Sequence, residues 1–132
     1  LGGKRLLDGG VSDPIPVKWM LSRGYEKNVV VLTRDVKYRK KANPKMQLFL
    51  KAVLHKYPAF LKDLEERHIH YNETLEELAS LEKEGRIHII RPSSPIQAAM
   101  IERDESNLER IYQTGRADMK KDLEKLKAYL DS

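Results

Sequence analysis

Cysteine is absent from the chain, and its absence excludes a whole group of sites and reactions. Without thiols the protein has no disulfide bridge, no thiolate metal site and no cysteine nucleophile. Long apolar runs are missing too, because no stretch approaches the roughly 18 to 20 residues that a membrane-spanning helix needs. We therefore expect a cytoplasmic protein, free or peripheral to the membrane.

The charge of the chain is mixed and shows only a mild excess of one sign. Its 25 basic and 20 acidic residues leave a net charge of +5, which favours anionic partners weakly. A nucleic-acid surface would place aromatic residues or a glycine-rich motif among the basic ones, and the densest basic cluster holds one tyrosine. We therefore expect no nucleic-acid partner. An apolar content of 40% over 132 residues still allows a globular core.

The order of apolar patterns predicts an α/β fold. The predicted elements are a strand at 4–7, a helix from Pro16 to Gly24, a strand at 28–33, a helix from Pro44 to near His55, a helix from Pro58 to Gly85, a strand at 86–91 and a helix that a Ser106–Glu109 capping box begins. The stretch NVVVLT at 28–33 is continuously apolar, which predicts a central parallel strand covered on both faces. Apolar stripes on the last two helices predict buried faces, with Gly115 as a break in the final helix.

Two features invite a site assignment, and each also has a structural explanation. His68 and His70 form a His-Ile-His sequence, but side chains two residues apart on a helix point in different directions. We therefore expect no metal there. The Asp8-Gly9-Gly10 sequence is by its spacing a tight turn, because Asp-Gly favours positive φ angles.

The sequence around this turn is similar to that of bacterial patatin-like phospholipases. The similarity is carried by LLDGGVSDPIPV, the strand NVVVLT, the YRKK stretch and RHIHYNETLEELASLEKEGRIHIIRPSSP, and so runs through the whole chain. The resemblance implies a partial patatin-like layered α/β fold with short parallel strands. It assigns residues 1–43 to the end of the catalytic core and 44–132 to a C-terminal helical region with one further strand at 86–91.

The resemblance also implies a chemistry. In that family a serine on a Gly-x-Ser-x-Gly elbow attacks a lipid ester, and the aspartate of an Asp-Gly-Gly motif is its partner, without histidine, metal or cofactor. By resemblance Asp8 is this catalytic base, and Gly9 and Gly10 let the backbone turn closely beside the serine. The expected substrate is a lipid or another ester.

The nucleophile that this chemistry needs is missing. None of the seven serines lies in Gly-x-Ser-x-Gly, and Ser12 is best explained as a turn residue. In the family the serine motif precedes the Asp-Gly-Gly motif, and the sequence begins with Leu1 rather than methionine. We therefore expect the C-terminal part of a longer hydrolase, inactive alone and prone to associate with a second copy through uncovered apolar surface.

A basic loop follows the second predicted strand and is the second candidate site. Its basic residues are Lys37, Arg39, Lys40, Lys41 and Lys45. Ligands of α/β sheets bind beyond the carboxyl ends of strands, so this loop is a candidate contact with anionic lipid headgroups, whereas the alternative is a solvated surface. A second hypothesis for the whole chain is a non-catalytic helical interaction module. The catalytic hypothesis places Asp8 at a cleft, and the module hypothesis leaves it in an exposed turn.

Overall fold

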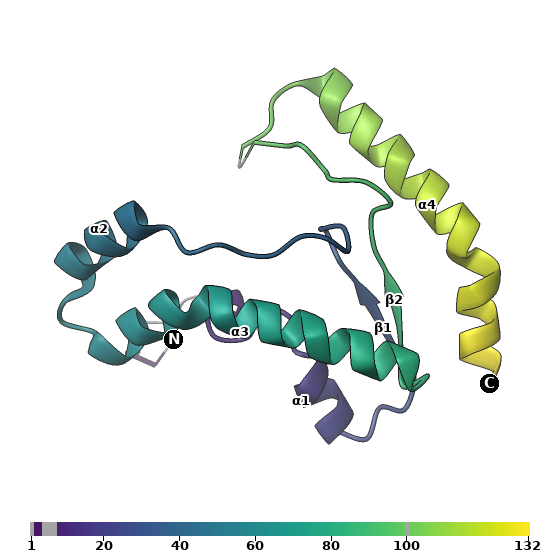
Figure 1. Ribbon diagram of the computed structural model, residues 1–132, viewed down its shortest axis with the longest axis horizontal. Helices are drawn as coiled ribbons and strands as arrows, with labels where there is room; N and C mark the ends of the chain where they lie inside the picture. The colour runs from purple at the N-terminus through teal and green to yellow at the C-terminus, as the bar shows by residue number, and fades with distance from the viewer. Residues whose placement is uncertain (1, 4–7, 100) are drawn as a thin grey trace.

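The computed structural model describes residues 2–3, 8–99 and 101–132, so the predicted strand at 4–7 lies outside the described residues. Helices and a small parallel sheet form the fold, which confirms the α/β class at this level (Figure 1). In chain order the elements are the 3-10 turn η1 (Gly9–Val11), α1 (Val17–Ser22), β1 (Asn28–Val31), α2 (Pro44–Leu54), α3 (Pro58–Lys83), β2 (Ile87–Ile90) and α4 (Glu105–Asp131).

The helix ends follow local chemistry. Pro44 and Pro58 are the first residues of α2 and α3, where a missing N–H costs nothing, and Gly85 follows α3 with a φ of 73°. The predicted Ser106–Glu109 capping box is wrong. Asp104 occupies the N-cap position instead, because its carboxylate accepts hydrogen bonds from the Ser106 and Asn107 amides. Helix α4 continues through Gly115 without a break.

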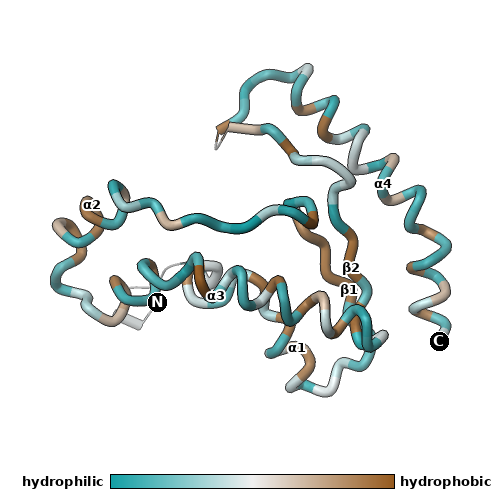
Figure 2. Tube along the Cα trace, viewed as in Figure 1, coloured by the Kyte–Doolittle hydropathy of each residue, from teal (hydrophilic) through white to brown (hydrophobic). Residues whose placement is uncertain are grey.

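The core lies on one face of the two-stranded sheet. Parallel pairing places Asn28 opposite Ile87 and Val31 opposite Ile90. The buried apolar residues are Val17 of α1, Leu32, Leu78 and Leu81 of α3, and Ile87 and Ile89 of β2. Figure 2 shows the hydrophobic colour on both strands and much less of it along α4. Helices α1 and α3 thus cover the same face of the sheet.

The other face of β1 is open, which differs from the predicted central strand. Side chains alternate along a strand, so Val30 and Leu32 point to the core while Val29 and Val31 point away. Val29 is 41% exposed and Val31 is 69% exposed. Within the described residues β2 is the only strand that pairs with β1. The continuous apolar run therefore predicted the strand correctly, but the prediction that both faces of this strand are covered is wrong for the described residues.

Helix α4 lies beside β2 and is attached by polar contacts (Figure 1). The Tyr129 hydroxyl donates to the Arg86 carbonyl at 3.0 Å and accepts from the Asn28 amide at 2.9 Å. The Tyr129 ring stacks on His88, whose Nε2 lies 2.5 Å from the Asp122 carboxylate. No described residue of α4 is buried, so its predicted apolar stripe does not enter the core. No helix in the described ranges is long and apolar enough to cross a membrane.

Candidate functional site

The Asp-Gly-Gly sequence forms a short 3-10 turn that Asp8 caps. The Asp8 carboxylate accepts a hydrogen bond from the Gly10 amide at 2.8 Å through Oδ1. Neither Gly9 nor Gly10 has a positive φ, so the turn predicted from Asp-Gly is present with a different backbone conformation. A Cβ at Gly10 would lie 3.3 Å from that same carboxylate oxygen. Glycine at position 10 therefore leaves room for the Asp8 side chain.

Arg67 on α3 fixes this turn in place. Its Nε and one terminal nitrogen both donate to the Gly10 carbonyl, at 3.1 Å and 2.8 Å. A cavity of about 170 Å³ lies beside the contact, and Val11, Ser12, Pro14, Asp63, Arg67 and His70 line it. Asp8 itself is exposed and does not line this cavity. The structure therefore places the predicted base on an anchored turn at the surface of the described chain.

Ser12 behaves as the turn residue that its sequence context indicates. Its hydroxyl donates to the Gly9 carbonyl at 3.2 Å, and its amide donates to the same oxygen at 3.1 Å. These contacts belong to the turn and not to a nucleophile elbow.

The basic loop lies at the edge of the sheet where both strands end. A cavity of about 340 Å³ opens there between residues 35–38, which follow β1, and residues 93–95, which follow β2. Among the five predicted basic residues only Lys40 is partly buried. Arg39 folds back and donates to the Val36 and Tyr38 carbonyls, and Lys37, Lys41 and Lys45 are exposed. The five cations therefore do not form one continuous site.

Asn72 of α3 holds the loop at Lys40. The Asn72 amide accepts from the Lys40 N–H at 2.8 Å and donates to the Lys40 carbonyl at 3.0 Å. A side-chain amide that pairs with both backbone groups of one residue fixes the loop as a neighbouring strand would. Sequence reasoning missed this contact because Asn72 lies 32 residues away.

A cluster of cations and tyrosines surrounds Lys40. The Tyr38 and Tyr71 rings meet edge to face at 6.0 Å. The Arg34 guanidinium lies 5.0 Å from the Tyr38 ring, and the Lys40 amine lies 5.3 Å from the Tyr71 ring. Both distances are within the range of cation–π attraction. We call Arg34, Lys40 and Arg67 the cationic cluster.

The electrostatics of the cationic cluster are unbalanced. Burial lowers the pKa of the Lys40 amine, and the charges of Arg67 and Arg34 lower it further. Burial also raises the pKa of the Tyr71 hydroxyl. Within the described ranges none of the three cations forms an ion pair with a carboxylate. Sequence reasoning included Lys40 but missed Arg34 and Arg67. The i, i+4 spacing of Arg67 and Tyr71, which places both on one face of α3, is the sequence signal that could have found Arg67.

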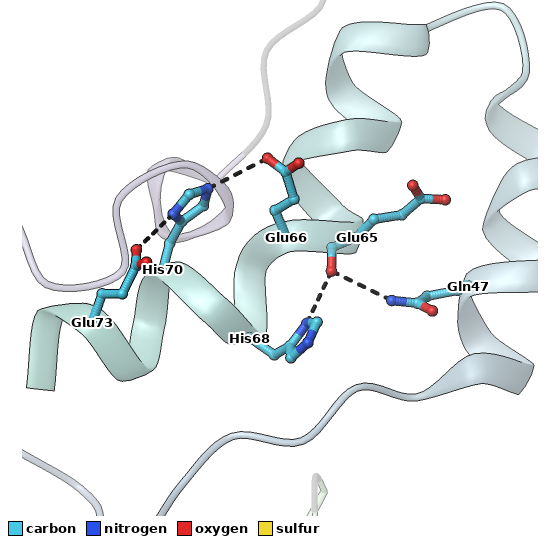
Figure 3. Close-up of polar contacts among 6 residues, drawn as sticks. All are labelled: Gln47, Glu65, Glu66, His68, His70 and Glu73. Carbon is cyan, nitrogen blue, oxygen red and sulfur yellow. Dashed lines mark hydrogen bonds and ion pairs between the residues drawn. The ribbon is translucent and has the colours of Figure 1, made fainter.

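The two histidines of α3 point in different directions, as their spacing predicts (Figure 3). His68 Nδ1 lies 2.9 Å from the Glu65 carbonyl, which also accepts from Gln47 of α2 at 3.4 Å. His70 lies between Glu73 and Glu66. Hydrogen bonds to these two carboxylates raise the pKa of the His70 imidazole, and the bond to Glu73 has the larger effect. No group of three or more histidine, aspartate or glutamate side chains in the described part of the chain is placed to bind a metal ion.

Comparison with known proteins identifies one family. The search of curated proteins and the search of solved structures give no match. A family model described as a domain of unknown function, DUF6363, matches residues 57–131. The matched region contains α3, β2 and α4, and with them Arg67, Tyr71 and Asn72. Because the match covers more than half of the sequence, the chain belongs to the DUF6363 family.

Proposed function

We propose that the chain is the C-terminal part of a patatin-like serine lipid acyl hydrolase, in which Asp8 is the base for a serine upstream of residue 1. The observation that supports this function is the anchored turn: Arg67 holds Gly10 and so fixes the segment that carries Asp8. The exposure of Asp8 supports the alternative function given below. A catalytic base must be fixed in position and also reachable by its partner. The sheet of β1 and β2 would then be one part of a larger layered sheet.

The geometry at Asp8 suits proton transfer. The Gly10 amide binds Oδ1 and so orients the carboxylate, and Oδ2 has no hydrogen-bond partner in the described residues. In the proposed reaction Oδ2 accepts the serine proton while the serine oxygen attacks the ester carbon, and the proton then passes to the leaving alcohol. A carboxylate that is exposed to water is a weak base. The upstream part of the enzyme would exclude water from the carboxylate and raise its basicity.

The substrate of this proposal is a lipid or another ester, and the reaction needs no cofactor. The exposed basic residues Lys37, Lys41 and Lys45 would meet an anionic membrane surface, each contributing about 1 kcal/mol near such a surface. The side chain of Arg39, which the loop carbonyls hold, contributes its charge to the same surface.

Substitution of Asp8 in the complete protein tests this function. We expect Asp8→Asn to fold normally and to lose ester hydrolysis on the order of 10²- to 10⁴-fold, because an amide cannot accept the serine proton. Asp13→Asn is the matched control, since Asp13 is another exposed acid of the same segment and should keep full activity. The 132-residue chain alone should show no ester turnover above background. Full activity of folded Asp8→Asn would refute the proposal.

A second function, a non-catalytic interaction or dimerisation module beside a hydrolase core, is favoured by three observations. Asp8 lies in an exposed turn, and the apolar stripe of α4 is accessible, with Tyr112 56% and Leu130 49% exposed. The DUF6363 match begins at residue 57, beyond the Asp-Gly-Gly turn, as an appended module would. Retained activity in Asp8→Asn would leave this function as the better explanation.

A further inference from the structure

We propose that helix α2 lies flat on an anionic lipid membrane, with its apolar side inserted among the lipids and the basic residues around it on the headgroups. The exposed apolar residues of this side, which we call the outward face of α2, are Met46, Leu48, Phe49 and Val53. The inference deepens the membrane contact of the proposed function and rests on that function for a lipid substrate. The binding itself needs neither Asp8 nor an upstream serine.

Contacts with α3 fix which side of α2 points outward. Gln47 donates to the Glu65 carbonyl at 3.4 Å, and the Lys51 amine lies 2.9 Å from the Glu65 carboxylate. At about 100° of rotation per residue, Phe49 lies on the side of the helix opposite Gln47 and Lys51. Figure 1 shows α2 at one end of the molecule, beside the start of α3 and away from the two strands. A surface helix normally turns its polar side outward, and α2 does the opposite.

The outward face exposes large apolar side chains together. Leu48 is 72% exposed and Phe49 is 62% exposed. Met46 and Val53 lie at i−3 and i+4 from Phe49 and are also more than half exposed. Figure 2 shows the hydrophobic colour along α2. With 11 residues α2 is too short to cross a bilayer, whereas a helix of this kind can lie in the interface with its apolar side inserted.

The sequence around α2 carries positive charge only. Residues 36–62 contain eight basic residues and no acidic one, although the whole chain has a net charge of +5. The rest of the chain is therefore slightly acidic, and the positive charge is concentrated in this segment. Lys41, Lys45 and Lys56 are exposed before, within and after the helix. Lysines beside an inserted apolar face are attracted to anionic headgroups.

The same features disfavour two other occupants of the outward face. Pairing with α2 of a second copy would bring two acid-free segments together, and their charges would repel each other. A protein groove that encloses a basic amphipathic helix needs access to most of its circumference, but the side with Gln47 and Lys51 is held on α3. A helix with one open face fits a flat surface such as a membrane.

Sedimentation with lipid vesicles tests the membrane contact of the 132-residue chain. Vesicles of phosphatidylcholine with phosphatidylglycerol should bind the chain much more strongly than vesicles of phosphatidylcholine alone, and salt should weaken this binding. Phe49→Ala should weaken it about tenfold or more, because a large inserted side chain is lost. Tyr112→Ala is the matched control, since it removes an aromatic ring of similar exposure, 56%, from α4 and should change binding less than twofold.

A second pair of variants tests the charge. Lys45→Gln should weaken binding to the same vesicles about fivefold, as expected for one lysine near an anionic surface. Lys120→Gln removes the same charge from an exposed position of α4 and should change binding less than twofold. Circular dichroism and thermal melting establish that every variant folds.

Fluorescence separates insertion from contact by charge alone. Trp19 is the only tryptophan of the chain, so Trp19→Phe combined with Phe49→Trp places a single indole on the outward face. Its emission should shift to shorter wavelength with the anionic vesicles, and brominated lipid should quench it. Vesicle binding with unchanged emission would refute insertion. A lower mean mass of Phe49→Ala in light scattering without lipid would refute it too, because a second copy would then cover the face.

The complete protein distinguishes this proposal from the hydrolase function. Asp8→Asn should bind vesicles as the wild-type protein does, and Phe49→Ala should lose vesicle binding but keep the turnover of a water-soluble ester. Vesicle binding without any ester hydrolysis would refute the hydrolase function and support the membrane contact. The proposal is overturned if the wild-type chain ignores anionic vesicles, if Phe49→Ala and Tyr112→Ala lose binding equally, or if only the 132-residue chain binds, since the upstream part would then cover α2.

Discussion

Helices α3 and α4 have nearly equal lengths, 26 and 27 residues, and both carry apolar stripes, yet they meet the sheet in opposite ways. Helix α3 buries Leu78 completely and Leu81 almost completely against the strands. Helix α4 buries none of its described residues and contacts β2 through Tyr129 and Asp122. The comparison shows that periodicity predicts a helix but does not say what covers its apolar face.

The difference follows from how each helix connects to the sheet. Helix α3 ends at Lys83 and β2 begins at Ile87, so its last turns must lie against the strand that follows. Gly85, with its φ of 73°, makes this tight reversal. Helix α4 follows β2 after a longer connecting segment. Asp118 of α4 accepts a hydrogen bond from the Ser93 amide of this segment at 2.9 Å and so joins the helix to it. The same hydrogen bond lowers the pKa of the Asp118 carboxyl. Polar anchors therefore take the place of core packing.

Truncation of Leu78 should have the largest effect on stability. Leu78→Ala leaves a cavity in the buried core, and we expect a loss of about 2 to 5 kcal/mol in the free energy of unfolding. Leu123→Ala is the matched control on α4, where the side chain is 39% exposed and its truncation should cost less than about 1 kcal/mol. Urea denaturation measures both. Equal losses would show that α4 is packed as tightly as α3.

Removal of one hydroxyl from α4 should have a smaller and more local effect. Tyr129→Phe keeps the ring beside His88 but loses the bonds to Asn28 and Arg86, at a cost of about 1 to 3 kcal/mol. We expect faster hydrogen exchange of α4 amides while the amides of β2 stay protected. Tyr112→Phe, on the exposed stripe of α4, is the control and should change neither rate. Unchanged exchange in Tyr129→Phe would show that other contacts hold the helix.

Local signals predicted much of the fold, and long-range contacts explain what they missed. Pro44, Pro58 and Gly85 marked helix ends correctly, because each acts on its own backbone. The face that β1 leaves open was not predictable, because a run of valines is equally compatible with one covered face or two. At the candidate site the Asp-Gly-Gly turn was visible in the sequence, whereas its attachment to Arg67 joins residues 57 positions apart. No local pattern encodes such a pair.

The open face and edge of β1 favour association of two copies of the chain. A substitution there should have the smallest effect on the stability of the single chain. The Leu32 amide donates to Ile90, and parallel strands alternate their bonding, so the backbone groups of Val29 and Val31 face away from β2. A groove of about 360 Å³ runs along this edge beside Pro14 and Met20. Unpaired backbone groups next to exposed valines favour pairing with another strand, and we expect the isolated chain to associate with a second copy there.

Val31→Lys tests this association, because a charged side chain at a strand edge opposes pairing. Since Val31 is 69% exposed, we expect the stability of the single chain to change by no more than about 0.5 kcal/mol. Light scattering should show a dimer or larger species for the wild-type chain and a smaller mean mass for Val31→Lys. Ala117→Lys adds the same charge to an exposed position of α4 and should leave the mass unchanged. A strictly monomeric wild-type chain would refute association, and loss of the dimer in Ala117→Lys alone would move the interface from β1 to α4.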